Sequence, residues 1–112
     1  MNVNVPTGHL KPGVDGRRLY TDWARQLAEP VYNNAIDIGT GPVAIHAQLL
    51  TAHGLGVYCT EIDVNSLEHA KDLHKESTMV FHKVSDPNDL LHSLIKQYQS
   101  TKYDFCVCNP PF

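Results

Sequence analysis

The stretch Ala35-Ile36-Asp37-Ile38-Gly39-Thr40-Gly41 decides the fold of this chain. Its first half is an apolar run interrupted by one aspartate, which is typical of a buried strand, and the two glycines allow a tight turn. Apolar residues at helical spacing follow across about 43–53. A strand, a glycine turn and a helix in this order predict one unit of a parallel sheet with crossover helices.

The same alternation continues along the chain. A short helix is expected across Tyr20–Glu29, where Pro30 ends it. Further strands are expected at Val57–Ile62, Met79–Val84 and 103–108. A helix is expected at about 64–76, with Asp63 as its N-cap. Another helix is expected after Asp86-Pro87, with an apolar stripe formed by Leu90, Leu91, Leu94, Ile95 and Tyr98. We therefore predict an α/β protein with residues 1–34 as a lead-in and residues 35–112 as the sheet domain.

Composition restricts the protein to one compact domain. The 112 residues with 42% hydrophobic content allow a single modest core. A formal net charge of −3 argues against a self-sufficient nucleic-acid binder, because phosphate contacts need clustered basic residues. The chain has neither a secretory leader pattern nor an apolar stretch long enough for a membrane span, so we expect an intracellular protein with no membrane partner.

The cysteines favour structural burial. Cys59, Cys106 and Cys108 lie in apolar strand-like runs, and Cys-x-Cys lacks the spacing of a zinc knuckle. We expect three buried thiols in a reducing compartment. Trp23 is likewise expected to be a packing anchor, paired with Leu27.

The histidines do not form a metal-binding pattern. His69 and His74 are five residues apart and are expected on different helix faces. His46 and His53 are expected to share a helix face with nothing acidic beside them. We therefore expect no metal.

The last four residues, Asn109-Pro110-Pro111-Phe112, predict the chemistry. The side chain of Asn109 and the peptide carbonyl of Pro110 are two acceptors, and the prolines restrict the backbone so that both can point at one NH2 group. Phe112 supplies a flat surface for a heterocycle. This corner therefore predicts methylation of a planar amine, with Asn109, Pro110 and Phe112 as the catalytic residues.

The glycine turn and one acidic residue predict the cofactor. The third glycine of a dinucleotide fingerprint would fall at Ala44, so a pyrophosphate cofactor is less favoured than a compact nucleoside. Glu61 ends the second expected strand, where a carboxylate can bind both hydroxyls of a ribose. The turn, the acid and the Asn109 corner follow one another in the order expected for use of S-adenosylmethionine.

These residues resemble a known family, the adenosine N6-methyltransferases of structured RNA that share an Asn-Pro-Pro-Phe motif. The family comprises the eukaryotic enzyme of U6 spliceosomal RNA and its bacterial ribosomal-RNA relatives. The resemblance is carried by Leu10–Trp23, which is similar to the segment before the family's sheet, by 37–41 and Thr60–Asp63, which resemble its first and second motifs, and by 103–112, which is most similar to the eukaryotic branch.

The resemblance implies a Rossmann-like class I S-adenosylmethionine-dependent methyltransferase fold. In that fold the strand order begins 3-2-1-4, and this chain would hold the N-terminal half, with about four parallel strands and their crossover helices. It would be a fragment or short isoform, inactive alone, of an enzyme acting on adenosine in hairpins or bulges of structured RNA. We expect it in the nucleus, with the cytoplasm as a second location; the sequence carries no signal for the oligomeric state.

The resemblance also implies roles for single residues. Arg17 would pair with the methionine carboxylate of the cofactor, Gly39 would lie against the cofactor, and Glu61 would hold its ribose. Asn109 would lie between cofactor and adenine. The cofactor-binding residues expected in this way are Arg17, Asp37, Gly39, Gly41, Glu61 and Asn109.

The adenine contact, the strength of cofactor binding and the substrate class are each left open by the sequence. The residue that contacts the cofactor's adenine is Asp86, Asn88 or Asp89, because this loop is longer than the family's. Val43 and Leu19 replace polar residues of the family, and each change is expected to weaken cofactor binding by about 1 kcal/mol, the typical value of one hydrogen bond. Alternative functions are methylation of DNA adenine or of protein glutamine, and a non-catalytic module that binds the cofactor or a partner.

Overall fold

Strands and helices alternate through the computed structural model, which describes residues 1–9, 13–28, 33–89 and 91–108. The elements are α1 (Val14–Ala28), β1 (Asn34–Ile38), α2 (Ile45–Thr51), β2 (Gly56–Glu61), α3 (Val64–Leu73), β3 (Val80–Lys83), α4 (His92–Gln97) and β4 (Phe105–Cys108). The four strands pair in parallel in the order β3-β2-β1-β4. The expected α/β fold with a 3-2-1-4 order is confirmed.

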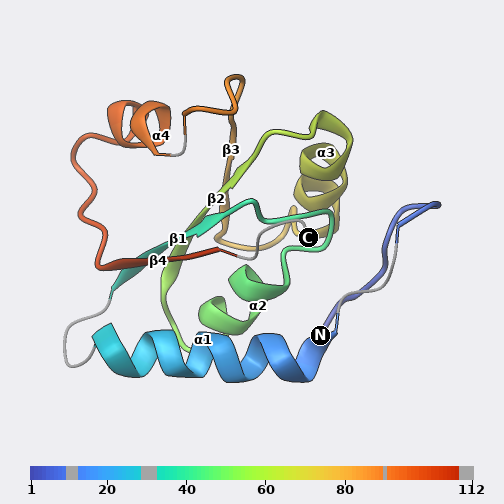
Figure 1. Ribbon diagram of the computed structural model, residues 1–112, viewed down its shortest axis with the longest axis horizontal. Coiled ribbons are helices and arrows are strands. Elements are labelled where there is room, and N and C mark those ends of the chain that lie inside the picture. The colour runs from blue at the N-terminus through green and yellow to red at the C-terminus, as the bar shows by residue number, and fades with distance from the viewer. Residues whose placement is uncertain (10–12, 29–32, 90, 109–112) are drawn as a thin grey trace.

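The two faces of the sheet are covered by different helices (Figure 1). Side chains of alternate strand residues, among them Ala35, Val57 and Val107, form the main core with residues of α2 and α1. On the opposite face, the ring of Tyr58 packs edge-on against Tyr98 beyond the end of α4, with centroids 5.3 Å apart. Because all strands run in parallel, β1, β2 and β4 end at the same edge of the sheet, where α1 also passes.

Helix α1 begins at Val14, six residues before the expected start at Tyr20. Prolines and glycines made the lead-in look irregular, but Arg17 donates to the carbonyl of Gly13 at 2.9 Å and supports the first turn. The expected stop at Pro30 lies outside the described residues. Trp23 is 59% exposed, so its prediction as a packing anchor was wrong: its side of the helix faces away from the sheet core.

The expected helix after Asp86-Pro87 starts later, at His92. The carboxylate of Asp86 accepts a hydrogen bond from the Asn88 amide, and this local bond makes a turn instead of a helix. The N-cap of α4 is Leu91, and the carboxylate of Asp89 accepts from the Ser93 amide in the first turn at 3.2 Å. The N-cap predicted at Asp63 is confirmed by its bond from the Ser66 amide.

Burial of the cysteines was predicted correctly only for Cys59. Cys106 and Cys108 are exposed, because they alternate with Phe105 and Val107, which pack into the main core. Their faces of β4 lack the cover that α4 gives to β2 and β3. Burial raises the pKa of the Cys59 thiol well above its ordinary value, and the nearby Asp37 carboxylate adds to the shift, so this thiol stays neutral.

Candidate functional site: a cleft beside the glycine turn

The turn after β1 adopts a backbone that glycine permits and other residues resist. Gly39 and Gly41 have φ values of 69° and 75°, in the left-handed region. A Cβ placed on either glycine would meet no atom within 4 Å. The space beside the turn is therefore open, and a ligand can approach the backbone there.

The end of β2 fixes this turn by hydrogen bonds to its amides. The amide of Thr40 donates to the carbonyl of Thr60 at 2.9 Å, and the amide of Gly41 donates to Oε1 of Glu61 at 2.8 Å. The second carboxylate oxygen of Glu61 accepts from the amides of Ile62 and Asp63, both at 3.0 Å. Glu61 is thus held in one orientation while its carboxylate, which has about four acceptor positions, can still take a ligand hydroxyl.

Asp37 lies beneath the turn, where it is 1% exposed. Its Oδ2 accepts a hydrogen bond from the hydroxyl of Thr40 at 2.6 Å, and its Oδ1 lies 3.6 Å from Nδ1 of His46. The structure therefore brings Asp37 to the turn as a support and not to the open side. The expectation that His46 has no acidic neighbour was wrong, because the turn brings β1 and α2 together.

A cleft of about 460 Å³ opens between α1 and the ends of α2 and β4. Its lining residues are Gly13, Gly16, Arg17, Tyr20, His46 and Cys108. Arg17 uses one N–H for its bond to Gly13, and a guanidinium carries five such donors. A half-buried arginine with unused donors in a cleft is suited to a carboxylate ligand.

Tyr20 connects α1 to the end of β4. Its hydroxyl accepts a hydrogen bond from the amide of Cys108 at 3.1 Å, and its ring packs edge-on against His46 with centroids 5.2 Å apart. Cys108 directly precedes Asn109. The predicted catalytic residues Asn109, Pro110 and Phe112 lie outside the described residues.

The loop after β3 carries the three candidates for a contact to the cofactor's adenine. Hydrogen bonds from the side chain and the amide of Ser93 hold the pKa of Asp89 below its ordinary value. The carboxylate of Asp86 is engaged with the Asn88 amide. Asp86, Asn88 and Asp89 stay predictions for the adenine contact.

The histidines gather at the turn more than the sequence suggested. His69 and His74 bind the neighbouring carbonyls of Pro42 and Val43, so the expectation of separate helix faces was wrong: His74 follows the last residue of α3.

His53 also has an acidic neighbour that was not expected, because its Nε2 lies 3.7 Å from Oδ1 of Asp22.

No group of three or more His, Cys, Asp or Glu side chains close enough to hold a metal ion occurs among residues 1–9, 13–28, 33–89 and 91–108. In the same part of the chain, no helix combines the length and apolar character needed to cross a membrane.

A family model described as RNA methyltransferase matches residues 1–112. The chain belongs to this RNA methyltransferase family. A U6 small nuclear RNA (adenine-(43)-N(6))-methyltransferase from Caenorhabditis briggsae is 33% identical to it over 122 aligned positions. The human RNA N(6)-adenosine-methyltransferase METTL16 is 30% identical. Both alignments cover 100% of this chain, which spans 25% and 22% of the two relatives' lengths.

Solved structures of this RNA methyltransferase family share the fold. A METTL16 methyltransferase domain superimposes with a TM-score of 0.86 at 30% identity, over 100% of this chain and 47% of that one. The N-terminal domain of human METTL16 in complex with SAH gives 0.83 at 31% identity, over 98% and 46%. The human catalytic domain in complex with the MAT2A 3′UTR hairpin 6 gives 0.74 at 32%, over 98% and 38%.

The two residues expected to depart from the family's pattern, Val43 and Leu19, lie in different surroundings. Val43 is 3% exposed and packs with Ile45 and Leu49, so its side chain belongs to a small apolar cluster. Leu19 is 73% exposed on α1. The supporting residues Thr60, His46 and Tyr20 were missed as site residues, because only their contacts across the fold distinguish them.

Proposed function

We propose that this chain forms the cofactor-binding part of an S-adenosylmethionine-dependent methyltransferase that modifies the N6 amine of adenosine in structured RNA. The observation that carries the proposal is the open glycine turn with Glu61 on one side and Arg17 in the adjoining cleft, in a chain of the RNA methyltransferase family. The solved relatives with SAH and with an RNA hairpin support this choice of cofactor and substrate.

The residues around the cleft fit such a cofactor. Gly39 and Gly41 leave room for its close approach, and Arg17 would hold its carboxylate. Glu61, whose carboxylate already accepts from three amides, would accept a hydrogen bond from a ribose hydroxyl at its remaining position. Asp37 would act from below, by keeping Thr40 and so the turn in place. When bound, the cofactor supplies a methyl group that is already activated on a sulfonium, so the protein's task is mainly alignment.

The residues of the Asn109 corner would act on the adenine. The exocyclic nitrogen of adenine is a poor nucleophile because its lone pair is shared with the ring. Oδ1 of Asn109 and the carbonyl of Pro110 would accept hydrogen bonds from the two N–H groups of this amine. These bonds would stabilise the positive charge that develops on the nitrogen. Phe112 would stack on the face of the base, a contact worth about 1–3 kcal/mol.

This proposal divides the chain into a lead-in, residues 1–34, which contributes Arg17, and the methyltransferase part, residues 35–112. It places the protein's action in the nucleus, where spliceosomal RNA is assembled. The activity belongs to a protein of the relatives' length, since the chain spans only about a quarter of the relatives compared here.

A hybrid protein tests the proposed function. Residues 1–112 replace the matching segment of the human catalytic domain, and transfer from methyl-labelled S-adenosylmethionine is measured on an RNA hairpin, a DNA duplex and a glutamine-containing protein. We expect label in the RNA, and its loss in Asn109→Ala with cofactor binding retained. A folded hybrid that binds the cofactor but labels DNA or protein instead would contradict the proposed substrate.

A further inference from the structure

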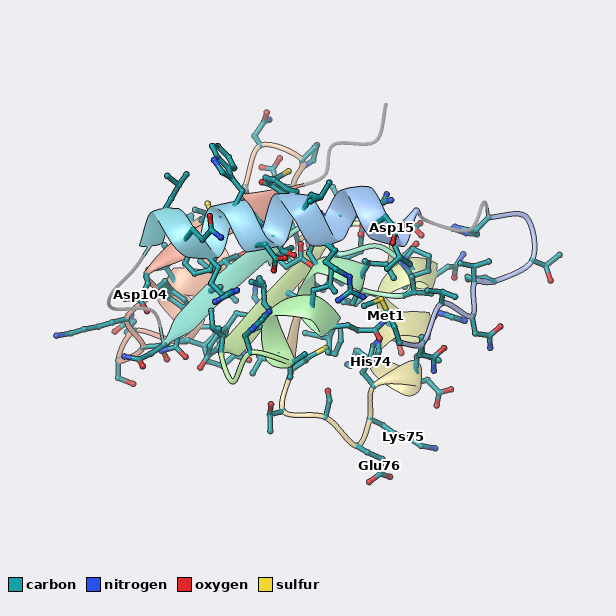
Figure 2. The ribbon with its side chains drawn as sticks, turned by 90° about the horizontal axis from the view of Figure 1, so that it is seen from below. Met1, Asp15, His74, Lys75, Glu76 and Asp104 are labelled. Atoms are coloured by element: carbon teal, nitrogen blue, oxygen red, sulfur yellow. The ribbon has the colours of Figure 1, made fainter. Side chains whose placement is uncertain are left out.

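Two consecutive carbonyls directly after the glycine turn are held by imidazole side chains. Nδ1 of His69 lies 2.7 Å from the carbonyl oxygen of Pro42, and Nε2 of His74 lies 2.9 Å from that of Val43. A carbonyl oxygen only accepts, so both ring nitrogens must carry the proton and donate. Figure 2 shows His74 at the end of α3, before Lys75 and Glu76, which point away from the domain.

The segment Pro42-Val43 is also held by a third hydrogen-bond donor and by the packing of the Val43 side chain. Nε2 of Gln48 donates to the carbonyl of Val43 at 2.8 Å, so this oxygen accepts from two side chains. The Val43 side chain packs into an apolar cluster with Leu49 of α2 and Leu73 of α3. Residues 42–43 therefore join α3 to α2 at the point where the turn becomes a helix.

This backbone needs support because it is unfavourable by itself. Ala44 has a φ of 54°, the one non-glycine residue with a positive φ in the described part of the chain. Such a conformation costs an alanine about 1 kcal/mol or more. The amides of Thr40 and Gly41 are bound by the end of β2, and the carbonyls of Pro42 and Val43 are bound by His69 and His74.

We propose that His69 and His74 are positioning residues for the cofactor. They hold the peptide groups after Gly41 in the bound conformation before the cofactor arrives, and they act through the turn without touching the ligand. A turn that is already ordered loses less conformational entropy on binding, which raises affinity. The inference rests on the proposed function, since it presumes that the turn binds S-adenosylmethionine.

Paired substitutions test these roles on the 112-residue chain. Leucine removes the donor, whereas asparagine at 69 and glutamine at 74 keep an N–H near the position of the ring nitrogen. Binding of S-adenosylmethionine and S-adenosylhomocysteine is measured by calorimetry, and unfolding by circular dichroism. His82→Leu is the matched control, because Nε2 of His82 makes a similar bond to Ser93 on the other side of the sheet.

We expect His69→Leu and His74→Leu each to raise the dissociation constant about three- to tenfold, the value of one hydrogen bond. His69→Asn and His74→Gln should restore most of the affinity, and His82→Leu should lower the melting temperature with unchanged affinity. If a leucine variant does not fold, alanine replaces leucine at that position, and its affinity is compared with that of the asparagine or glutamine variant.

Several results would overturn the inference. Leucine variants that stay folded and bind as tightly as the wild type would do so, and so would asparagine and glutamine variants that bind no better than the leucine ones. Failure of the proposed function looks different: the folded wild-type chain would bind neither ligand, and the inference would fall with it.

Discussion

The two sides of the proposed cofactor site are held in different ways. The turn wall, residues 39–44, has amides bound by Thr60 and Glu61 and carbonyls bound by His69 of α3 and by His74 just after it. The helix wall, residues 13–20 at the start of α1, is tied to the sheet through Tyr20, which accepts a hydrogen bond from the Cys108 amide. The far side of α1 exposes Leu19, Trp23 and Leu27 by 73%, 59% and 68%.

The two walls would therefore contribute differently to ligand binding. In the proposed site, the hydrogen bonds to the turn wall hold it before the cofactor binds, so the turn wall would determine where the ribose lies. The helix wall is held mainly by packing, because Tyr20 and Ala24 pack against the main core and Thr21 is buried. Arg17 makes its hydrogen bond within α1's first turn, to Gly13. Substitutions in the turn wall should therefore reduce stability and affinity together, whereas substitution of Arg17 in the helix wall should reduce affinity much more than stability.

The largest effect is expected from removal of the buried support of the turn wall. Asp37→Ala leaves the hydroxyl of Thr40 and the ring of His46 without their acidic partner and should lower the free energy of unfolding by about 3 kcal/mol. The control is Asp22→Ala on α1, whose carboxylate is 40% exposed and should contribute no more than about 0.5 kcal/mol. Urea unfolding measures both. Equal losses of unfolding free energy in Asp37→Ala and Asp22→Ala would contradict the proposed difference between the two walls.

Glu61→Gln should produce the next largest effect, on affinity. The amide can still accept from Gly41 but loses the charge that strengthens bonds to hydroxyls, so S-adenosylhomocysteine should bind about ten- to a hundredfold more weakly. Calorimetry measures the change, with Glu68→Gln on the exposed side of α3 as the matched control. Unchanged affinity in Glu61→Gln would place the ribose elsewhere.

Arg17→Ala tests whether the helix wall binds the carboxylate of the cofactor. We expect S-adenosylmethionine to bind about tenfold more weakly, because a charge-assisted pair with its carboxylate is lost. The melting temperature should fall only slightly, since the bond of Arg17 to Gly13 is exposed. Methylthioadenosine, which lacks the carboxylate, should bind wild type and variant equally. Arg18→Ala, the exposed neighbour, should bind both ligands like the wild type. A loss of methylthioadenosine affinity in Arg17→Ala would show that Arg17 supports the fold instead.

The smallest effect concerns the other end of the sheet and depends on pH. The amides of Asn33 and Asn34 donate to Oδ2 of Asp104, labelled in Figure 2, and hold its pKa below the ordinary 3.8. A lowered pKa in the folded state stabilises it above pH 3.8, and this stabilisation is lost as the pH falls through the folded-state pKa. The wild type should therefore be slightly more stable than Asp104→Asn at neutral pH, with the difference vanishing in acid, and cofactor affinity should not change. Chemical denaturation across the pH range checks this, and a difference that grows in acid would contradict it.

The sheet and the turn wall could be predicted because local residues determine them. Apolar runs bounded by glycines gave β1 and β2 to within one residue, and Asp63 marked the start of α3 correctly. Gly41 and Glu61, twenty residues apart, were expected at one site, and a hydrogen bond joins them. The Asn109 corner, on which the chemistry depends, stays a prediction.

Other features could not be predicted because they depend on which elements meet. The exposure of Cys106 and Cys108 follows from the position of β4 beside β1 on one side and from the short reach of α4. The bonds of His69 and His74 to the turn join residues 27 and 31 positions apart, and no spacing rule within α3 indicates them. The early start of α1 depends on a contact of Arg17 that the glycines in the lead-in obscured.

The central claim is that the cofactor binds between the turn wall and the helix wall, and amide chemical-shift mapping tests it most directly. The 15N-labelled chain is titrated with S-adenosylhomocysteine. We predict saturable shifts of the Gly39, Gly41 and Glu61 amides together with Arg17 on α1, and no shift at Asp104. Saturable shifts that leave Gly39, Gly41 and Arg17 unchanged would contradict the account.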